Sequence, residues 1–177
     1  MIEDEGKLVR FLSLTGLLIP VRDKAGQLVA LRVCPDAPGD GGKYRWINSR
    51  SNQYPDRPSP ETPCHVPRGL AETVDTLRTT EGESKADAAF QLSGVPTIAI
   101  PGVISWSRIL PLIEEFHPQS VLIGLDSDFR TNGAVATALQ GLVIKSILSN
   151  EHSWLIRLPS QQLASSRRNM NFEFACP

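Results

Sequence analysis

The sequence predicts an α/β fold in which a mostly parallel sheet carries helices on both faces and follows a small α+β subdomain built on a β-hairpin. From residue 74 onward, short apolar segments alternate with amphipathic helical patterns, which is the order produced by parallel strands joined through crossover helices. The 14 prolines and 13 glycines are concentrated in the first third of the chain, which indicates a division near residue 70. With 177 residues, of which 41% are hydrophobic, the chain is long enough to bury a substantial core.

The first unit is predicted to contain a hairpin followed by loops. Its two strands, at residues 16–23 and 27–33, flank the turn-forming triplet Lys24, Ala25 and Gly26. Glycine favours such a turn because it adopts positive φ angles readily. The segments that follow are a loop rich in Pro, Gly and Asp at 35–42, a short β-prone piece at 43–47 and an irregular stretch rich in Pro, Ser and Asn at 48–63.

The second unit is predicted to alternate strand and helix up to residue 158. The elements, in order, are strand 74–79, helix 84–92, strand 97–100, helix 106–116, strand 121–125, helix 133–148 and strand 154–158. Gly94 is expected to end the first of these helices, because glycine is common just after a helix C-terminus. The residues after Pro159 show no periodicity. We therefore expect a small basic subdomain at 1–70, an α/β domain at 71–158 and a loose tail at 159–177.

Composition and charge argue against several classes of protein. No apolar run reaches the roughly 18 residues of a membrane helix, and the acidic opening residues are unlike a secretory signal, so we expect a cytoplasmic chain with no membrane partner. Lysine and arginine number 18 against 19 acidic residues, a net charge of −1, so any nucleic-acid site has to come from a local arrangement. The three cysteines, Cys34, Cys64 and Cys176, have neither disulfide nor zinc-ligand spacing, and no zinc is expected.

Acidic residues follow two of the predicted strands at the point where each strand ends. Glu81 follows the strand at 74–79, and Asp126 and Asp128 follow the strand at 121–125. If these strands are neighbours, the three carboxylates converge at one edge, because functional groups of parallel sheets gather at the carboxyl ends of the strands. A hard divalent cation such as Mg²⁺ prefers such oxygen ligands, so this edge is a candidate magnesium site. For Asp128 the alternative is capping of the helix that follows.

Three segments at these strand ends resemble the Toprim domain of primases and topoisomerases. They are residues 80–87 (TEGESKAD), 101–106 (PGVISW) and 125–128 (LDSD). Two earlier segments, residues 19–26 (IPVRDKAG) and 42–49 (GKYRWINS), are similar to the basic subdomain that precedes Toprim in bacterial replicative primases. The chain therefore resembles the primase-like Toprim proteins of bacteria and mobile elements. The resemblance implies a Rossmann-like Toprim sheet that follows a pre-Toprim subdomain along the chain.

The resemblance further implies a Mg²⁺- or Mn²⁺-dependent nucleotidyltransferase that synthesises primers on single-stranded DNA from nucleoside triphosphates, in the replication of a mobile element. It implies that Glu81 acts as general acid and base, and that Asp126 and Asp128 hold the metal with Glu81 as a further ligand. A replicative helicase as an additional partner is left open. The chain departs from the family in two places: Lys85 stands where replicative primases have an acid, and no acid occurs from position 158 to 172, where primases carry a third acidic motif.

Basic residues stand beside aromatic ones in the first unit. The candidates for nucleic-acid contact are Lys43, Tyr44, Arg45, Trp46 and Arg50. Single-stranded nucleic acid is bound through phosphate contacts and base stacking, which need these residue types. The alternative is a half-buried strand whose two rings face inward, and the resemblance to primases favours template contact.

Lys85, Gly102 and Ser105 are candidate phosphate contacts. Gly102 and Ser105 follow a strand and precede a helix, where backbone amides can meet a phosphate. The alternative is a tight connection without a ligand.

Two alternative functions remain open. One is a Toprim nuclease, which uses the same acids without nucleoside triphosphates, and the other is a catalytically incomplete module that binds nucleic acid.

Overall fold

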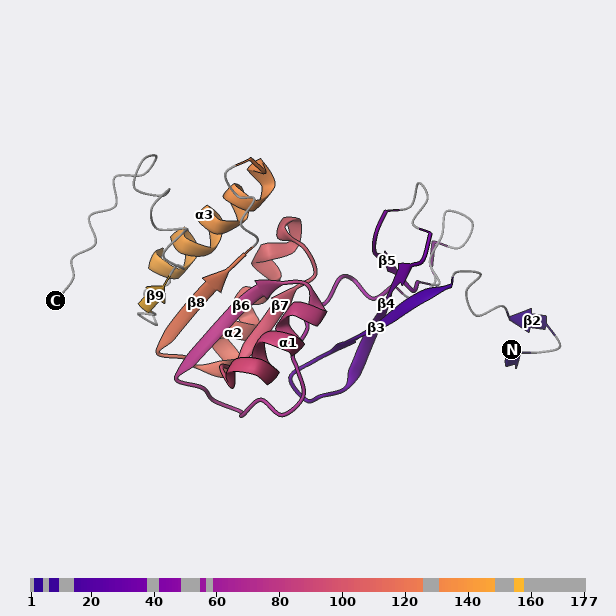
Figure 1. Ribbon diagram of the computed structural model, residues 1–177, viewed down its shortest axis with the longest axis horizontal. Helices are drawn as coiled ribbons and strands as arrows, with labels where there is room; N and C mark the ends of the chain where they lie inside the picture. The colour runs from indigo at the N-terminus through magenta and orange to yellow at the C-terminus, as the bar shows by residue number, and fades with distance from the viewer. Residues whose placement is uncertain are drawn as a thin grey trace.

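The computed structural model describes residues 2–4, 7–9, 15–37, 42–48, 55–56, 59–125, 131–148 and 155–157. Figure 1 shows an α/β unit on the C-terminal side, an antiparallel sheet beside it, and a separate pair of short strands nearer to the N-terminus. That pair consists of β1 (Ile2–Asp4) and β2 (Lys7–Val9).

The antiparallel sheet is built on the predicted hairpin. Its strands, in order across the sheet, are β3 (Gly16–Arg22), β4 (Leu28–Pro35) and β5 (Arg45–Trp46). The turn closes locally, because the Gly26 amide donates to the Asp23 carbonyl over 3.0 Å and the Gln27 amide donates to the Asp23 carboxylate over 2.8 Å. Gly26 takes a φ of +75°, which residues with a side chain rarely adopt. The hairpin prediction is confirmed.

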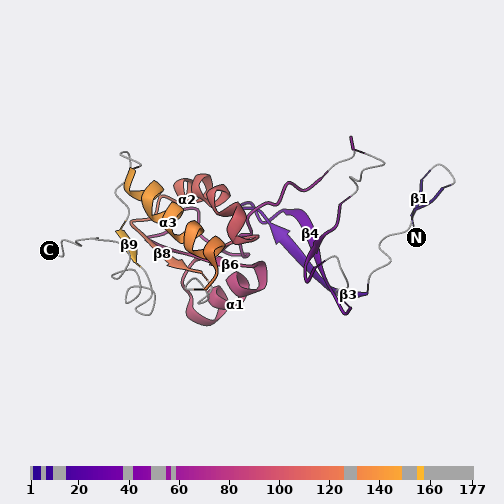
Figure 2. The same cartoon turned by 90° about the horizontal axis from the view of Figure 1, so that it is seen from above.

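The second sheet is parallel throughout. Its strands, in spatial order, are β7 (Thr97–Ile100), β6 (Thr76–Glu81), β8 (Ser120–Gly124) and β9 (Leu155–Arg157). The helical segments, in chain order, are α1 (Glu83–Ser93), η2 (Val103–Ile109), α2 (Leu110–Phe116) and α3 (Gly133–Leu148). Figure 2 shows α1 on one side of the sheet and α2 and α3 on the other. The predicted fold class, a mostly parallel sheet with helices on both faces, is confirmed.

The core lies between the parallel sheet and the segments η2, α2 and α3. The sheet contributes Leu77, Ile98 and Ile123, and α2 contributes Ile113 and Phe116, all of them buried. All four residues of β7 are buried, which explains why this strand does not alternate between apolar and polar residues. None of the helices in the described ranges is long and apolar enough to cross a membrane.

The predicted helix at 106–116 is wrong in form. The chain instead makes a 3₁₀ segment, η2, and then continues as the short helix α2. Ser105 has non-helical angles within η2, and Pro111 stands in the first turn of α2. Because proline has no N–H to donate to the fourth residue before it, an α-helix accepts it readily only in its first turn. Pro111 therefore sets the start of α2 at Leu110.

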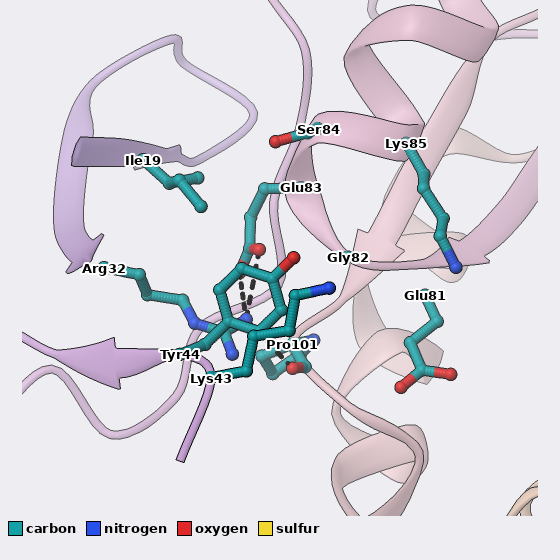
Figure 3. Close-up of a pocket in the computed structure, with 10 residues that line it drawn as sticks. All are labelled: Ile19, Arg32, Lys43, Tyr44, Glu81, Gly82, Glu83, Ser84, Lys85 and Pro101. Carbon is teal, nitrogen blue, oxygen red and sulfur yellow. Dashed lines mark hydrogen bonds and ion pairs between the residues drawn. The ribbon is translucent and has the colours of Figure 1, made fainter. Parts of the chain in front are cut away.

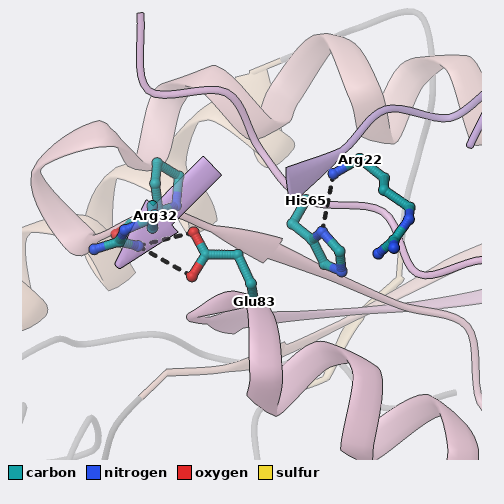
Figure 4. Close-up of polar contacts among 5 residues, drawn as sticks. Arg22, Arg32, His65 and Glu83 are labelled. Atoms are coloured by element: carbon teal, nitrogen blue, oxygen red, sulfur yellow. Dashed lines mark hydrogen bonds and ion pairs between the residues drawn. The ribbon is translucent and has the colours of Figure 1, made fainter. Parts of the chain in front are cut away.

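Residues 59–75 connect the two sheets, and His65 contacts both. Its backbone pairs with Ala99 of β7 through two hydrogen bonds of 2.9 Å. Its buried imidazole accepts the Arg22 N–H at Nδ1 over 3.2 Å, and Nε2 lies 3.1 Å from the Asp87 carboxylate on α1; Figure 4 shows the contact with Arg22. Because an N–H faces Nδ1, that atom is the acceptor, so the proton sits on Nε2 and is donated to Asp87. The predicted boundary near residue 70 falls within this connection, and the three predicted regions stay predictions.

Gly141 is the point where α3 meets the indole ring of Trp106. A Cβ atom at Gly141 would overlap the ring, whereas at Gly133, the first residue of the same helix, a Cβ atom would meet nothing within 4 Å. We expect Gly141→Ala to lower the free energy of unfolding by about 1–3 kcal/mol, the range for overpacked cores. Gly133→Ala, the control, should be neutral or slightly stabilising, because it restricts the unfolded chain. Urea unfolding followed by circular dichroism measures both, and equal stability of the two variants would contradict this packing.

His65→Ala removes the acceptor for the Arg22 N–H and the donor to Asp87. Leaving a buried N–H without a partner costs about 1–3 kcal/mol. Because the Arg22 N–H is only partly buried, we expect the free energy of unfolding to fall by an amount at the low end of that range. His65→Asn, whose amide oxygen can still be presented to Arg22, should recover part of the loss. Thermal unfolding is the measurement, and a wild-type midpoint for His65→Ala would show that the imidazole does not join the hairpin to α1.

Candidate active site

Glu81 is the last residue of β6, at the carboxyl end of the parallel sheet. Gly82 follows with a φ of +85°, and its N–H donates to the Ile100 carbonyl over 3.0 Å. This turn leads the chain directly from the strand into α1, and glycine suits it because of the positive φ. Glu81 is therefore held at the rim where α/β sheets bind their ligands.

The strand that precedes Asp126 and Asp128 is the direct neighbour of β6. β8 pairs with β6 in parallel, with Gly124 opposite Thr80, so the two strands end level at the same rim. Asp126 and Asp128 lie outside the described residues, and their convergence with Glu81 stays a prediction. Within the described ranges, no three His, Cys, Asp or Glu side chains lie close enough together to hold a metal ion.

A pocket of about 230 Å³ opens beside Glu81 and is lined by both structural units (Figure 3). The lining residues are Ile19, Arg32, Lys43, Tyr44, Glu81, Gly82, Glu83, Ser84, Lys85 and Pro101. Figure 3 shows Glu81 and Lys85 together on one side of the pocket, with Lys43 and Tyr44 across from them. Four candidate residues, two from each of two motifs that are far apart in the sequence, thus meet in one pocket.

Four other candidate residues that the structure describes are not part of this lining: Arg45, Trp46, Gly102 and Ser105. Arg50, like Asp126 and Asp128, lies outside the described residues. The Ser105 N–H donates to the Gly102 carbonyl over 3.0 Å, a bond of the kind expected in a tight connection. Phosphate contact by these two residues stays a prediction.

Arg32 of β4 reaches from the hairpin to the loops at the rim. Its Nη1 donates to both carboxylate oxygens of Glu83, over 2.8 and 3.0 Å, and to the carbonyl oxygen of Pro101 over 3.0 Å; Figure 4 shows the bonds to Glu83. Arg32 is 9% exposed and Glu83 is 3% exposed, so this ion pair is buried. Neither Arg32 nor Glu83 is among the site residues that the sequence predicts. The signal that could have marked Arg32 is a cation in the middle of an otherwise apolar strand at 28–35.

The two aromatic candidates pack against the same guanidinium group. The Cζ atom of Arg32 lies 4.8 Å from the centre of the Trp46 ring and 5.0 Å from that of Tyr44, and the Lys43 amine lies 5.2 Å from the Tyr44 ring. These are cation–π distances. Tyr44 is still 43% exposed, whereas Trp46 is partly buried. The rings are therefore anchored to the fold without being wholly enclosed by it.

Solved structures share this arrangement of sheets and helices. The primase fragment of the bacteriophage T7 primase-helicase protein superposes on 86% of this chain with a TM-score of 0.52 at 13% sequence identity. The DnaG catalytic core superposes on 85% of it with a TM-score of 0.54 at 18% identity. The chain has the fold of a primase catalytic core.

The likeness is one of fold, because no protein-family model and no curated protein matches the sequence. The chain spans 59% of the T7 primase fragment and 47% of the DnaG catalytic core. A DnaG primase catalytic domain bound to single-stranded DNA is similar to the same extent, with a TM-score of 0.54 at 16% identity over 85% of this chain and 50% of that one. The resemblance to Toprim-containing primases is confirmed at this level.

Cys64 lies next to His65 and lines a second cavity, of about 450 Å³. Burial raises the pKa of its thiol from 9.0 to about 11, although the positive charge of Arg108 acts in the opposite direction. Folding therefore favours the protonated thiol, which is the less reactive form.

The raised pKa predicts a slow thiol. In a Cys34→Ser/Cys176→Ser background, alkylation of Cys64 by iodoacetamide at pH 8 should be about 100-fold slower in the folded chain than in the unfolded one, because a pKa of about 11 in place of 9.0 reduces the thiolate fraction by that factor. The same shift stabilises the folded state fully below pH 9, and the contribution is lost as the pH rises through about 11. Equal alkylation rates in the two states would contradict the burial of this thiol.

Proposed function

We propose that this chain is a Mg²⁺-dependent nucleotidyltransferase that synthesises primers on single-stranded DNA from nucleoside triphosphates. The observation that carries the proposal is the shared pocket, in which Glu81 and Lys85 of the α/β unit meet Lys43 and Tyr44 of the antiparallel unit. The fold supports it, since the chain is similar to primase catalytic cores, one of them bound to single-stranded DNA. The setting that we propose is the replication of a mobile element in the cytoplasm.

Magnesium, or manganese, suits the donor set at the end of β6. Glu81 supplies hard carboxylate oxygens beside the pocket, and in this proposal Asp126 and Asp128 supply the others. When bound, such an ion neutralises charge on the phosphate oxygens during phosphoryl transfer. Glu81 also accepts the proton of the attacking 3′-hydroxyl group as its oxygen bonds to the α-phosphorus of the incoming nucleotide and pyrophosphate leaves. Lys85 contacts a phosphate of that nucleotide.

Template binding is assigned to the basic and aromatic residues in and around β5. Lys43, Arg45 and Arg50 contact phosphates, and Tyr44 and Trp46 offer ring surface to the bases. Lys43 and Tyr44 are exposed at the pocket, so a strand that stacks on these residues passes close to Glu81.

Primer synthesis by the purified chain tests the proposal. With single-stranded DNA, Mg²⁺ and labelled nucleoside triphosphates we expect labelled primers, and none after chelation of the metal. Glu81→Gln and Asp126→Asn should each lower the rate by roughly 10²-fold or more. A single positioned acid or base assists proton transfer by at least that factor, and we expect the loss of a metal ligand to cost no less.

Glu114→Gln is the matched control, because it neutralises an exposed carboxylate on α2 that does not line the pocket. This variant should keep full activity. Cleavage of the DNA without nucleoside triphosphates would identify the nuclease instead. Binding without turnover would identify a catalytically incomplete module, which the lack of acids from 158 to 172 favours. Equal primer yields from the wild type, Glu81→Gln and Asp126→Asn would contradict the proposed site.

A further inference from the structure

We propose that Arg32 is a positioning residue of this site, which fixes the aromatic rings of Tyr44 and Trp46 relative to Glu81 without touching the DNA itself. The inference rests on the proposed function and deepens it, because it adds a residue that acts on template binding through Tyr44 and Trp46. The guanidinium group has a polar anchor on one side and two ring contacts.

The hydrogen bonds of Arg32 connect it to the start of α1 and to the loop after β7, both at the rim of the parallel sheet. Glu83 stands two residues after Glu81, and Pro101 directly follows β7. A single nitrogen, Nη1, donates to both carboxylate oxygens of Glu83 and to the Pro101 carbonyl, and hydrogen bonds between charged groups are short and strong. The guanidinium group is therefore held at a fixed place relative to the ends of β6 and β7.

The ring contacts matter because the strand ladder that pairs β5 with β4 is short in the described residues. It is two residues long and lies at the edge of its sheet, paired with β4 through Arg45 opposite Val33 and Trp46 opposite Arg32. One further hydrogen bond, of 2.9 Å, runs from the Ile47 N–H to the Leu31 carbonyl. With so short a ladder, the cation–π contacts of two rings with one guanidinium group help to fix the orientation of β5.

The geometry favours orientation over stability as the role of Arg32. Its Nε is buried and has no hydrogen-bond partner among the described residues, which an arginine placed only for hydrogen bonding would avoid. A buried ion pair also adds little net stability compared with an apolar pair of similar volume. A planar guanidinium group, however, binds a carboxylate along its edge and rings on its faces at the same time.

Burial separates this role from direct DNA contact. Arg32 is only 9% exposed, whereas Lys43, on the same pocket, is exposed. A phosphate contact by Lys43 releases counterions, so its loss changes the salt dependence of binding. Loss of Arg32 should change the affinity and leave the salt dependence as it is.

The affinity for single-stranded DNA is measured by the fluorescence anisotropy of a labelled strand of about 12 nucleotides, at several salt concentrations. Arg32→Met/Glu83→Leu replaces the ion pair by apolar side chains of similar size and leaves the net charge unchanged. Arg32→Lys keeps the charge and loses the planar group. The matched control is Lys24→Met/Glu72→Leu, which removes an ion pair of 3.8 Å and a cation 4.5 Å from the Phe116 ring, outside this pocket.

We expect both Arg32 variants to fold, by circular dichroism, and to bind with a Kd about tenfold higher, the scale of losing one well-placed base stack. The slope of log affinity against log salt should stay at the wild-type value. Lys43→Ala should reduce that slope by about 0.7, as the loss of one phosphate contact to a single strand does. The Lys24→Met/Glu72→Leu control should keep both the wild-type Kd and the wild-type slope.

Wild-type affinity in folded Arg32→Met/Glu83→Leu overturns the inference, and so does a reduced salt slope, because that slope would make Arg32 a phosphate contact. If the double variant does not fold, Arg32→Lys decides by the same two readouts. If the variants show the expected binding pattern but the wild-type chain makes no primers, the role of Arg32 stands and the proposed nucleotidyl transfer is contradicted. A wild-type chain that binds no single-stranded DNA overturns both.

Discussion

The two structural units line one pocket because Arg32 and Glu83 form a buried ion pair between them. In the described residues the antiparallel sheet is a two-stranded hairpin extended by the two residues of β5, and a hairpin alone is at best marginally stable in water. A charge that leaves water needs a partner of opposite sign, so the burial of Glu83 at the start of α1 strongly constrains the position of β4. The relation of Lys43 and Tyr44 to Glu81 depends on that constraint.

A second contact on α1 restrains rotation about the first. His65 joins Arg22, at the end of β3, to Asp87, and Asp87 lies four residues after Glu83, about one helical turn further along α1. The Val66 N–H adds a bond of 2.9 Å to the Arg22 carbonyl. Contacts at two successive turns of one helix fix the orientation of the hairpin as well as its distance, so the hairpin can serve as a wall of the pocket.

The elements that could be predicted from the sequence have local signals. Asp23 closes the hairpin turn within four residues, and Gly94 ends α1 with a φ of +68°. The boundary between η2 and α2 lies inside a continuous apolar pattern, and the local signal for it is a single residue, Pro111. The ion pair carried no such signal: 51 residues separate Arg32 from Glu83, and neither periodicity nor spacing relates two residues on different sheets and helices.

The near-zero net charge of the chain is compatible with a nucleic-acid substrate because cationic side chains outnumber acidic ones among the described residues of the pocket. Among the described residues, three cationic and two acidic side chains line the pocket, and one of the acids, Glu83, is bound to Arg32. Glu81 therefore shares the pocket with two lysines, Lys43 and Lys85. Such an excess among the described residues favours an anionic substrate even though the whole chain sums to −1. In the proposed function, the carboxylates of Asp126 and Asp128 do not reverse it, because the divalent ion that they would hold balances their two negative charges. This local excess arises because the fold brings charged residues from distant segments to one pocket. Composition alone could therefore neither reveal it nor exclude it.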